Sequence, residues 1–361
     1  MVNSLIKSYK AVETLFADDS AFEMFEKIAN THAPSQTVQY TRAVVINEII
    51  KEFDLENSNF DPDFHGTGNS IFHTSDRDPK IMMMAHADQI SYFVDRKESE
   101  NLWRIIPFCK HLSTIQVAAV GLRYDLQDDC YKQVSTGQIF SKTQNDEAVP
   151  YYLSDHGELQ TGDRIVYHVP AHYQDGFVQG ITDNAAGVTA CLLAAKALFK
   201  SFPNSNAGFV FTDEEEGPAS VPAFFARGAR RLFRKMDTPD VCIVVDGHGG
   251  QDDKMLGSGA SFAEKTGGGL ATLTPPDLFV KQKFLVKEMQ KQGVQIFENH
   301  DRVSRGDDIA CLEVTRNVIS VGYPTVNRHF DTGYPTVALS DIVNLAKTIY
   351  WMAAYFENDD R

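Results

Sequence analysis

Histidine and acidic residues follow several apolar segments of this chain, at the point where each segment ends. They are His86 and Asp88 after residues 80–85, Glu214 and Glu215 after residues 207–212, and Asp246 after residues 241–245. In open α/β sheets, functional sites form at the carboxyl ends of the strands. Imidazole and carboxylate groups that converge there are suited to hold divalent metal ions for hydrolysis.

Each of these residues also has an ordinary structural interpretation. His86 and Asp88 could be a polar pair at a strand end, or a metal ligand with a carboxylate that orients it. Asp183 precedes a helical segment, where an aspartate commonly caps the helix. The acidic run Glu214-Glu215-Glu216 could be a solvated loop. Single motifs therefore leave both interpretations open, and only their combination favours a metal site.

The position of the acidic run argues against a merely solvated loop. Adjacent side chains in a strand point to opposite faces, so Glu214 and Glu215 can reach one site only where the strand has ended. The sequence places them there, just before Gly217-Pro218. One carboxylate could then bind a metal ion while its neighbour serves as general base.

The apolar pattern predicts the elements that position these residues. It indicates an α/β domain with a mixed, mostly parallel sheet flanked by helices, and a small β-barrel inserted into it. The predicted catalytic domain comprises residues 1–93 and 180–361, and the insert residues 94–179. The predicted helices are 11–29, 38–53, 187–199, 221–235, 275–292 and 340–356, and the predicted strands of the sheet include 80–85, 207–212, 241–245, 294–298 and 318–321.

Composition excludes some function classes. The chain has 361 residues, 43% of them apolar, and a formal charge of −15, which argues against a nucleic-acid partner. No apolar run is long enough to cross a bilayer, and the first residues lack the pattern of a signal peptide. The five cysteines are scattered singly, which indicates a reducing compartment. We therefore expect a cytoplasmic protein with no membrane partner.

Five short motifs together resemble the tetrahedral and glutamyl aminopeptidase family. The motifs are Ala85-His86-Ala87-Asp88, Asp183-Asn184-Ala185-Ala186-Gly187, Glu214-Glu215-Glu216-Gly217, Val245-Asp246, and Pro324-Thr325 followed by His329. That family comprises cocatalytic metallopeptidases with a β-barrel inserted between the first histidine and the bridging aspartate. The resemblance covers nearly the whole chain.

The resemblance implies a site with two divalent metal ions, zinc as the first expectation and cobalt or manganese as alternatives. It implies these roles: Asp183 bridges the metals, His86 and Asp246 complete one, Glu215 and His329 complete the other, Glu214 is the general base, and Asp88 orients His86. It also implies a cis peptide bond between Asp183 and Asn184. The expected substrates are short peptides with a free amino terminus, and the expected assembly is a homo-oligomer, with a dodecamer as one option.

Some positions depart from the family pattern and leave the substrate open. They are Gln89, Ser91, Ala185 and the segment Arg305-Gly306-Asp307-Asp308. The same chemistry on another amide, such as an acylated amino acid, is one alternative. A non-catalytic relative is a second. A glycosidase is a third, although its carboxylate pair would leave the histidines without a role.

Overall fold

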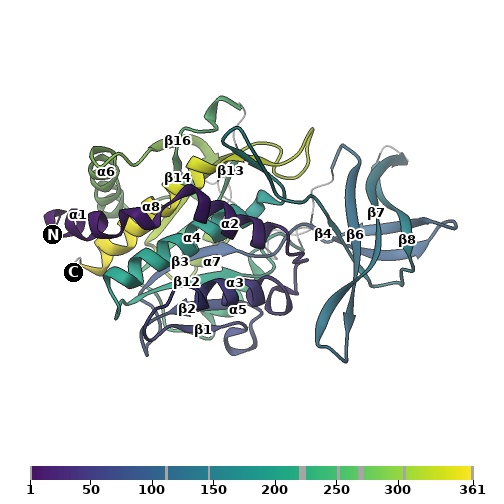
Figure 1. Cartoon of the computed structure of the whole chain (residues 1–361), viewed down its shortest axis with the longest axis horizontal. Helices are drawn as coiled ribbons and strands as arrows, with labels where there is room; N and C mark the ends of the chain where they lie inside the picture. Colours follow the sequence, from purple (N-terminus) through teal and green to yellow (C-terminus); the bar gives the residue numbers. More distant parts are fainter. Residues whose placement is uncertain are drawn as a thin grey trace.

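The computed structural model describes residues 2–109, 113–144, 147–218, 225–249, 253–266, 272–303 and 306–358. The chain forms an α/β body, which contains both ends of the described chain, and a β-barrel that extends from one end of this body (Figure 1). This arrangement confirms the predicted fold class.

A nine-stranded mixed sheet forms the centre of the body, in the order β1-β2-β12-β3-β13-β17-β14-β15, with β16 paired to β14. The four central strands β12, β3, β13 and β17 are parallel. The strands are β1 (Asn59–Asp61), β2 (Ser70–His73), β3 (Ile81–His86), β12 (Ala207–Thr212), β13 (Val241–Gly249), β14 (Ala260–Thr266), β15 (Thr272–Leu273), β16 (Ile296–Val303) and β17 (Val318–Thr325).

Strand β3 is apolar along its length because both faces of the sheet are covered. Met83 and Ala85 belong to the larger hydrophobic core, which also contains residues of α1 to α4, α6 and α8. Met82 and Met84 alternate with them and belong to a second core that includes residues of α5 and α7. Successive side chains of a strand point to opposite faces, so a strand buried on both faces needs a continuous apolar run.

Helices α4 and α8 pack against each other and against the sheet. Both are buried over most of their surface, which explains why their sequences are apolar on nearly all sides. The helices are α1 (Val2–Val12), α2 (Asp18–Ala29), α3 (Arg42–Lys51), α4 (Thr182–Ser201), α5 (Arg227–Phe233), α6 (Pro276–Lys291), α7 (Asp308–Leu312) and α8 (Leu339–Glu357), with 3-10 turns η1 (Glu13–Leu15), η2 (Val38–Tyr40), η3 (Phe64–Gly66) and η5 (Asp253–Met255).

The prediction of one continuous helix over residues 11–29 was wrong. The chain leaves helical geometry at Phe16 and is extended at Ala17, the residue before α2. The break lets Phe16 pack against Tyr9 and Tyr350, with ring centroids 6.2 and 6.0 Å apart. Burial of this aromatic side chain therefore overrides the helical periodicity of the segment.

The inserted domain is a closed antiparallel barrel in the order β4-β5-β8-β7-β6-β9. Its strands are β4 (Ser91–Lys97), β5 (Leu102–Pro107), β6 (Val117–Asp125), β7 (Cys130–Gln144), β8 (Glu147–Gly157) and β9 (Arg164–Tyr167). The barrel strands thus extend from Ser91 to Tyr167, whereas the predicted insert was 94–179. The difference arises because β10 (His172–Gln174) and β11 (Phe177–Gln179) form a separate three-stranded sheet with β18 (Thr336–Ala338).

Two other predicted elements differ in length. The predicted helix 221–235 is shorter in the structure, where α5 begins at Arg227, and residues 219–224 lie outside the described ranges. The strand predicted to end at residue 298 continues to Val303. Within the described ranges, no helix combines the length and apolarity that crossing a membrane would require.

Candidate metal centre and active site

Three adjacent parallel strands bring the first candidate residues to one edge of the sheet. In the strand register, Thr212 of β12 lies opposite His86 of β3, and Val245 of β13 lies opposite Ala85. Asp246 therefore follows at the level of His86. The expectation that the carboxyl ends of these strands converge is met by this register.

Asp183 lies between two groups of candidate ligands. It stands in the first turn of α4, and its Oδ1 is 3.1 Å from His86 Nε2 while its Oδ2 is 3.3 Å from His329 Nε2. His86 Nε2 is also 3.6 Å from Asp246 Oδ1. On the other side, His329 Nε2 is 4.0 Å from Glu216 Oε2. The two carboxylate oxygens of Asp183 thus face two different histidines, as a bridging carboxylate would.

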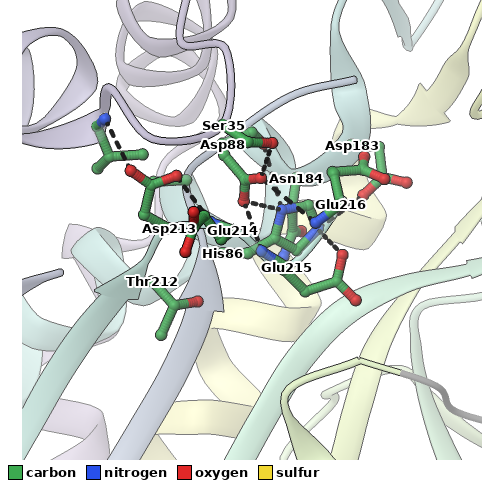
Figure 2. A network of polar contacts seen from close by, with 12 residues as sticks. Ser35, His86, Asp88, Asp183, Asn184, Thr212, Asp213, Glu214, Glu215 and Glu216 are labelled. Atoms are coloured by element: carbon green, nitrogen blue, oxygen red, sulfur yellow. Dashed lines mark hydrogen bonds and ion pairs between the residues drawn. The ribbon is translucent and has the colours of Figure 1, made fainter. Parts of the chain in front are cut away.

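The acidic loop after β12 brings Glu216 to the site in addition to the expected Glu215. Ligand atoms of His86, Asp183 and Glu216 all lie within 4.8 Å of one another. Glu215 is also at the site, with its Oε2 3.8 Å from His86 Nε2. Figure 2 shows Glu216 by Asp183 and Glu214 beside Asp213. Of the three consecutive glutamates, the second and third reach the metal-ligand candidates.

Glu214 instead forms ion pairs on the far side of the loop. Its carboxylate contacts Arg231 Nη1 and lies 3.8 Å from Arg227 Nε, and its side chain is 2% exposed. The backbone of Glu214 has a left-handed φ of 55°, which turns its side chain away from the direction of the next two. The structure therefore does not place Glu214 where a general base for this site would stand.

Asp213 explains why the chain turns at this point. This buried carboxylate accepts hydrogen bonds from the backbone N–H groups of Gln36 at 2.7 Å and Val38 at 3.2 Å. It also accepts one from the N–H of Glu214 at 2.7 Å. The segment after α2 thus anchors the start of the acidic loop, and this contact is between residues far apart in the sequence.

Asp88 contacts both His86 and the acidic loop. Its Oδ1 is 3.5 Å from His86 Nδ1, on the side of the imidazole opposite Asp183. The same carboxylate accepts hydrogen bonds from the N–H groups of Glu215 at 3.2 Å and Glu216 at 3.3 Å. Ser35 Oγ donates a further hydrogen bond to it at 2.5 Å. Asp88 is thus placed to orient a candidate histidine ligand and to hold the backbone of two acidic residues.

Burial and mutual repulsion shape the electrostatics of the site. Burial raises the pKa of Glu215 well above its usual value, and Asp246 and Asp307 raise it further against the opposing effect of His86. Burial also raises the pKa of Glu216, and Asp183 and Glu215 add to this effect. Carboxylates crowded in a buried site require compensating positive charge.

His86 and Asp183 shift in the directions expected of an ion pair. Burial by itself would lower the pKa of His86, but the surrounding carboxylates, Glu215 foremost, raise it well above its usual value. Burial would likewise raise the pKa of Asp183, yet hydrogen bonds from His329 and His86 lower it well below the usual range. The pKa of His329, by contrast, is lowered, with burial as the largest cause.

The donor set fits divalent cations. Glu216 Oε1 is buried and has no hydrogen-bond partner among the residues that the structure describes, which is costly for a buried acceptor. Two imidazole nitrogens and several carboxylate oxygens suit zinc, cobalt or manganese, and thiolate is absent from the cluster of His86, Asp183 and Glu216. Cations between these groups would both satisfy the acceptor and offset the repulsion.

Two arginines approach the same carboxylates, and neither was identified from the sequence. Arg302 Nη2 donates to Asp246 Oδ2 at 2.9 Å. Arg328 Nη1 lies 3.7 Å from Asp183 Oδ2. The position of Arg328 directly before His329 was a usable signal. No sequence signal pointed to Arg302, because it lies in β16 and approaches Asp246 only in the folded chain.

Several residues that depart from the family pattern form hydrogen bonds within the fold. The Gln89 side chain accepts from Ala33 N at 3.0 Å, and Ser91 Oγ accepts from Arg164 Nη2 at 2.8 Å. Asp307 accepts a hydrogen bond from Thr212 Oγ1, and Arg305 lies outside the described residues. The peptide bond between Asp183 and Asn184 is cis, as predicted.

No family model matches the chain, and no curated protein matches its sequence. Solved structures do match. TET1 peptidase of Pyrococcus horikoshii, which can assemble into a tetrahedron or a large octahedral shell, has a TM-score of 0.72 at 19% identity, covering 92% of this chain and 99% of its own.

Two further archaeal enzymes are similar over the same extent. Aminopeptidase APDkam598 of Desulfurococcus kamchatkensis has a TM-score of 0.71 at 19% identity and covers 94% of this chain and 95% of its own. The TET aminopeptidase of a marine-sediment archaeon of the Thaumarchaeota has a TM-score of 0.74 at 15% identity. The match covers 95% of this chain and 97% of that enzyme's chain. The chain therefore has the fold of the TET aminopeptidases, which confirms the resemblance at the level of structure.

Proposed function

We propose that this protein is a metal-dependent aminopeptidase that releases the N-terminal residue of short peptides, using two divalent metal ions. The observation that carries the proposal is the placement of Asp183, whose two oxygens face His86 and His329 at 3.1 and 3.3 Å. A single carboxylate shared by two sets of ligands is the arrangement that a cocatalytic pair of cations requires. The shared fold with archaeal aminopeptidases supports the same reaction.

The proposed roles follow the geometry and change the assignment within the acidic loop. His86 and Asp246 hold one cation, Glu216 and His329 hold the other, and Asp183 belongs to both. Glu216 replaces Glu215 as ligand, and Glu215 replaces Glu214 as general base, because only Glu215 and Glu216 reach the site. When bound, the cations supply Lewis acidity that polarises the scissile carbonyl and lowers the pKa of water.

Glu215 performs the proton transfers in this proposal. Its carboxylate accepts a proton from the attacking water and delivers it to the nitrogen of the departing amine. Burial raises the pKa of Glu215, which brings a carboxyl group closer to the range where it can act both as base and as acid. The hydrogen bond from its N–H to Asp88 holds the loop in place.

The same proposal extends to assembly and location. The TET1 peptidase of P. horikoshii forms closed shells, and we expect a homo-oligomer here, with a dodecamer as one option. The five cysteines form no disulfide within the described part of the chain, which supports a reducing, cytoplasmic location. Light scattering of the purified protein tests the assembly, and a clean monomer would contradict it.

Hydrolysis of a panel of aminoacyl-p-nitroanilides tests the function. The protein is treated with a chelator and then restored with zinc, cobalt or manganese, and bound metal is measured in parallel. Activity that disappears with chelation, returns with metal and is lost in Glu215→Gln is the expected result. Two bound metal ions without turnover of any member would exclude the aminopeptidase, and turnover of acylated amino acids alone would assign the site to another amide.

A further inference from the structure

Arg164 is a buried arginine of the barrel whose guanidinium reaches the α/β body. It lies on β9 and is 5% exposed. Its Nη2 donates hydrogen bonds to the carbonyl oxygen of Ser35 at 2.9 Å and to Ser91 Oγ at 2.8 Å. Ser35 belongs to the segment after α2, whereas Ser91 begins β4. One nitrogen of this barrel arginine thus joins the two domains.

Two aromatic rings hold the guanidinium of Arg164 in this position. Its Cζ lies 4.0 Å from the ring centroid of Phe93 and 5.0 Å from that of Phe108. Phe93 lies in β4 and Phe108 directly follows β5, so both rings come with the barrel. Contacts of this kind can contribute about 2 kcal/mol at a desolvated site. The barrel therefore holds the donors of Arg164 in a fixed direction, toward Ser35.

Ser35 and Gln36 connect this anchor to two carboxylates of the candidate site. Ser35 Oγ donates to Asp88 Oδ2 at 2.5 Å, a contact that Figure 2 shows. The N–H of Gln36 donates to Asp213 Oδ1 at 2.7 Å. Asp88 in turn contacts His86 and two N–H groups of the acidic loop. A hydrogen bond to the backbone of Ser35 therefore bears on both carboxylates that arrange the site.

The end of the acidic loop also packs against the barrel. A Cβ added at Gly217 would collide with the carbonyl oxygen and the ring of Phe108, so the backbone of Gly217 lies directly against that residue. Phe108 is held by a hydrogen bond from its N–H to the carbonyl oxygen of Ser91 at 2.9 Å. The loop is thus fixed at its start through Asp213 and at its end through Gly217, and Arg164 contacts the groups behind both points.

The charge of Arg164 lies close to the same carboxylates. Burial lowers the pKa of Arg164 to about 10, while Tyr131, Asp213 and Asp88 act in the opposite direction. The guanidinium is therefore charged at neutral pH. It places a fixed positive charge beside the buried acidic groups on which the site depends.

We propose that Arg164 is a positioning residue of the metal centre, through which the barrel fixes Asp88 and the acidic loop relative to His86. In this role the guanidinium touches neither substrate nor metal, and it acts through Ser35. Its effect on catalysis rests on the proposed function, whereas its effect on metal binding does not. Without the donors of Arg164, Ser35 loses its anchor and Asp88 is held less firmly.

Cobalt binding tests this role without any substrate. Co²⁺ is titrated into the chelator-treated full chain, and calorimetry gives the affinity while visible absorption reports the geometry of the ligands. Arg164→Met keeps an apolar stem between the two rings and removes the donors. We expect cobalt affinity and kcat each to fall about tenfold, with a changed spectrum and little change in KM. Arg164→Lys keeps the charge but not the planar donors, and it should lie between Arg164→Met and the wild type.

Two further variants separate positioning from stability of the barrel. Arg123 pairs with Asp163 at 2.7 Å within the barrel, on the strand beside β9. Arg123→Met therefore weakens the barrel without touching Ser35, and it should leave cobalt binding and kcat unchanged. In the double variant Arg164→Met/Ser35→Ala, the loss should be smaller than the product of the two single losses, because both replacements remove the same link to Asp88.

Unchanged cobalt affinity and spectrum in Arg164→Met would overturn the proposal. An equal loss in Arg123→Met would also overturn it, because stability of the barrel would then be the cause. Losses that multiply in the double variant would exclude the path through Ser35. If Arg164→Met does not fold, Arg164→Lys carries the test, and cobalt binding and kcat equal to the wild type would refute the role.

The cobalt measurements also keep this role distinct from the proposed function. If the wild type turns over no amide but its cobalt binding depends on Arg164 as expected, the aminopeptidase proposal fails and the positioning role stands. If the wild type is an active aminopeptidase whose cobalt binding and kcat are unaffected in Arg164→Met, the positioning role alone is refuted.

Discussion

The replacements Glu215→Gln and Glu214→Gln distinguish two assignments of the general base. Both keep the shape of the side chain and remove its charge. Glu215→Gln should lower kcat by about 10²- to 10⁴-fold, which corresponds to roughly 3–5 kcal/mol in the activation barrier. The reason is that Glu215 Oε2 lies 3.8 Å from His86 Nε2 at the centre of the site.

Glu214→Gln should instead affect stability. The carboxylate of Glu214 pairs with Arg231, whose side chain is 36% exposed, while that of Glu214 is 2% exposed. Breaking a fully buried pair costs about 3–5 kcal/mol, and an exposed pair contributes less than about 1 kcal/mol. This half-exposed pair lies between these limits, so we expect a loss of about 1–2 kcal/mol in the free energy of unfolding.

The assay compares both variants at saturating metal. The turnover of the best p-nitroanilide gives kcat, denaturant unfolding gives stability, and metal analysis checks that both sites are filled. We expect Glu214→Gln to keep kcat within about tenfold of the wild type and Glu215→Gln to be stable, loaded and inactive. If metal-loaded Glu214→Gln is inactive while Glu215→Gln is active, Glu214 is the base and the assignment from the loop geometry is wrong.

Three further variants test other contacts of the structure. Glu216→Gln should reduce bound metal from two ions to one per chain, because its Oε2 faces His329; full occupancy by metal analysis would contradict this. Asp88→Asn should lower metal affinity or kcat by about 10- to 100-fold, since Asp88 contacts His86 and the acidic loop; an unchanged chelator titration together with unchanged kcat would refute it. Burial raises the pKa of Asp341 to about 7, so its proton stabilises the folded state at low pH and this contribution is lost as pH rises through 7. Between pH 5 and pH 8 the wild type should therefore lose roughly 2–3 kcal/mol relative to Asp341→Asn, and parallel stability curves of the two proteins would contradict that pKa.

The ends of β12 and β3 could be predicted to within one residue because local rules dominate there, whereas β13 and β17 continue four residues beyond their predicted ends. Strand β12 begins and ends at the predicted residues, and β3 ends at His86. These strands are buried on both faces, so their apolar runs mark them clearly. The barrel was predicted only in outline, because the short strands after β9 pair with β18 from the far end of the chain.

The acidic loop shows where local reasoning stops. Alternation rules correctly required the strand to end before two glutamates could share a site. They could not decide which two, because that depends on the left-handed turn at Glu214. The turn accompanies contacts of Asp213 with Gln36 and Val38 and of Glu214 with Arg231. All these partners come from other segments.

The sequence by itself determined the α/β fold with its barrel insert and the group of residues from which a metal site is built. Residue type and strand ends carry this information, since burial on both faces and metal affinity leave local patterns. Only the tertiary structure decided which glutamates face Asp183 and that Arg302 and Arg328 lie beside the carboxylates. Those facts depend on contacts between distant segments, and side-chain direction after a strand end follows no local period.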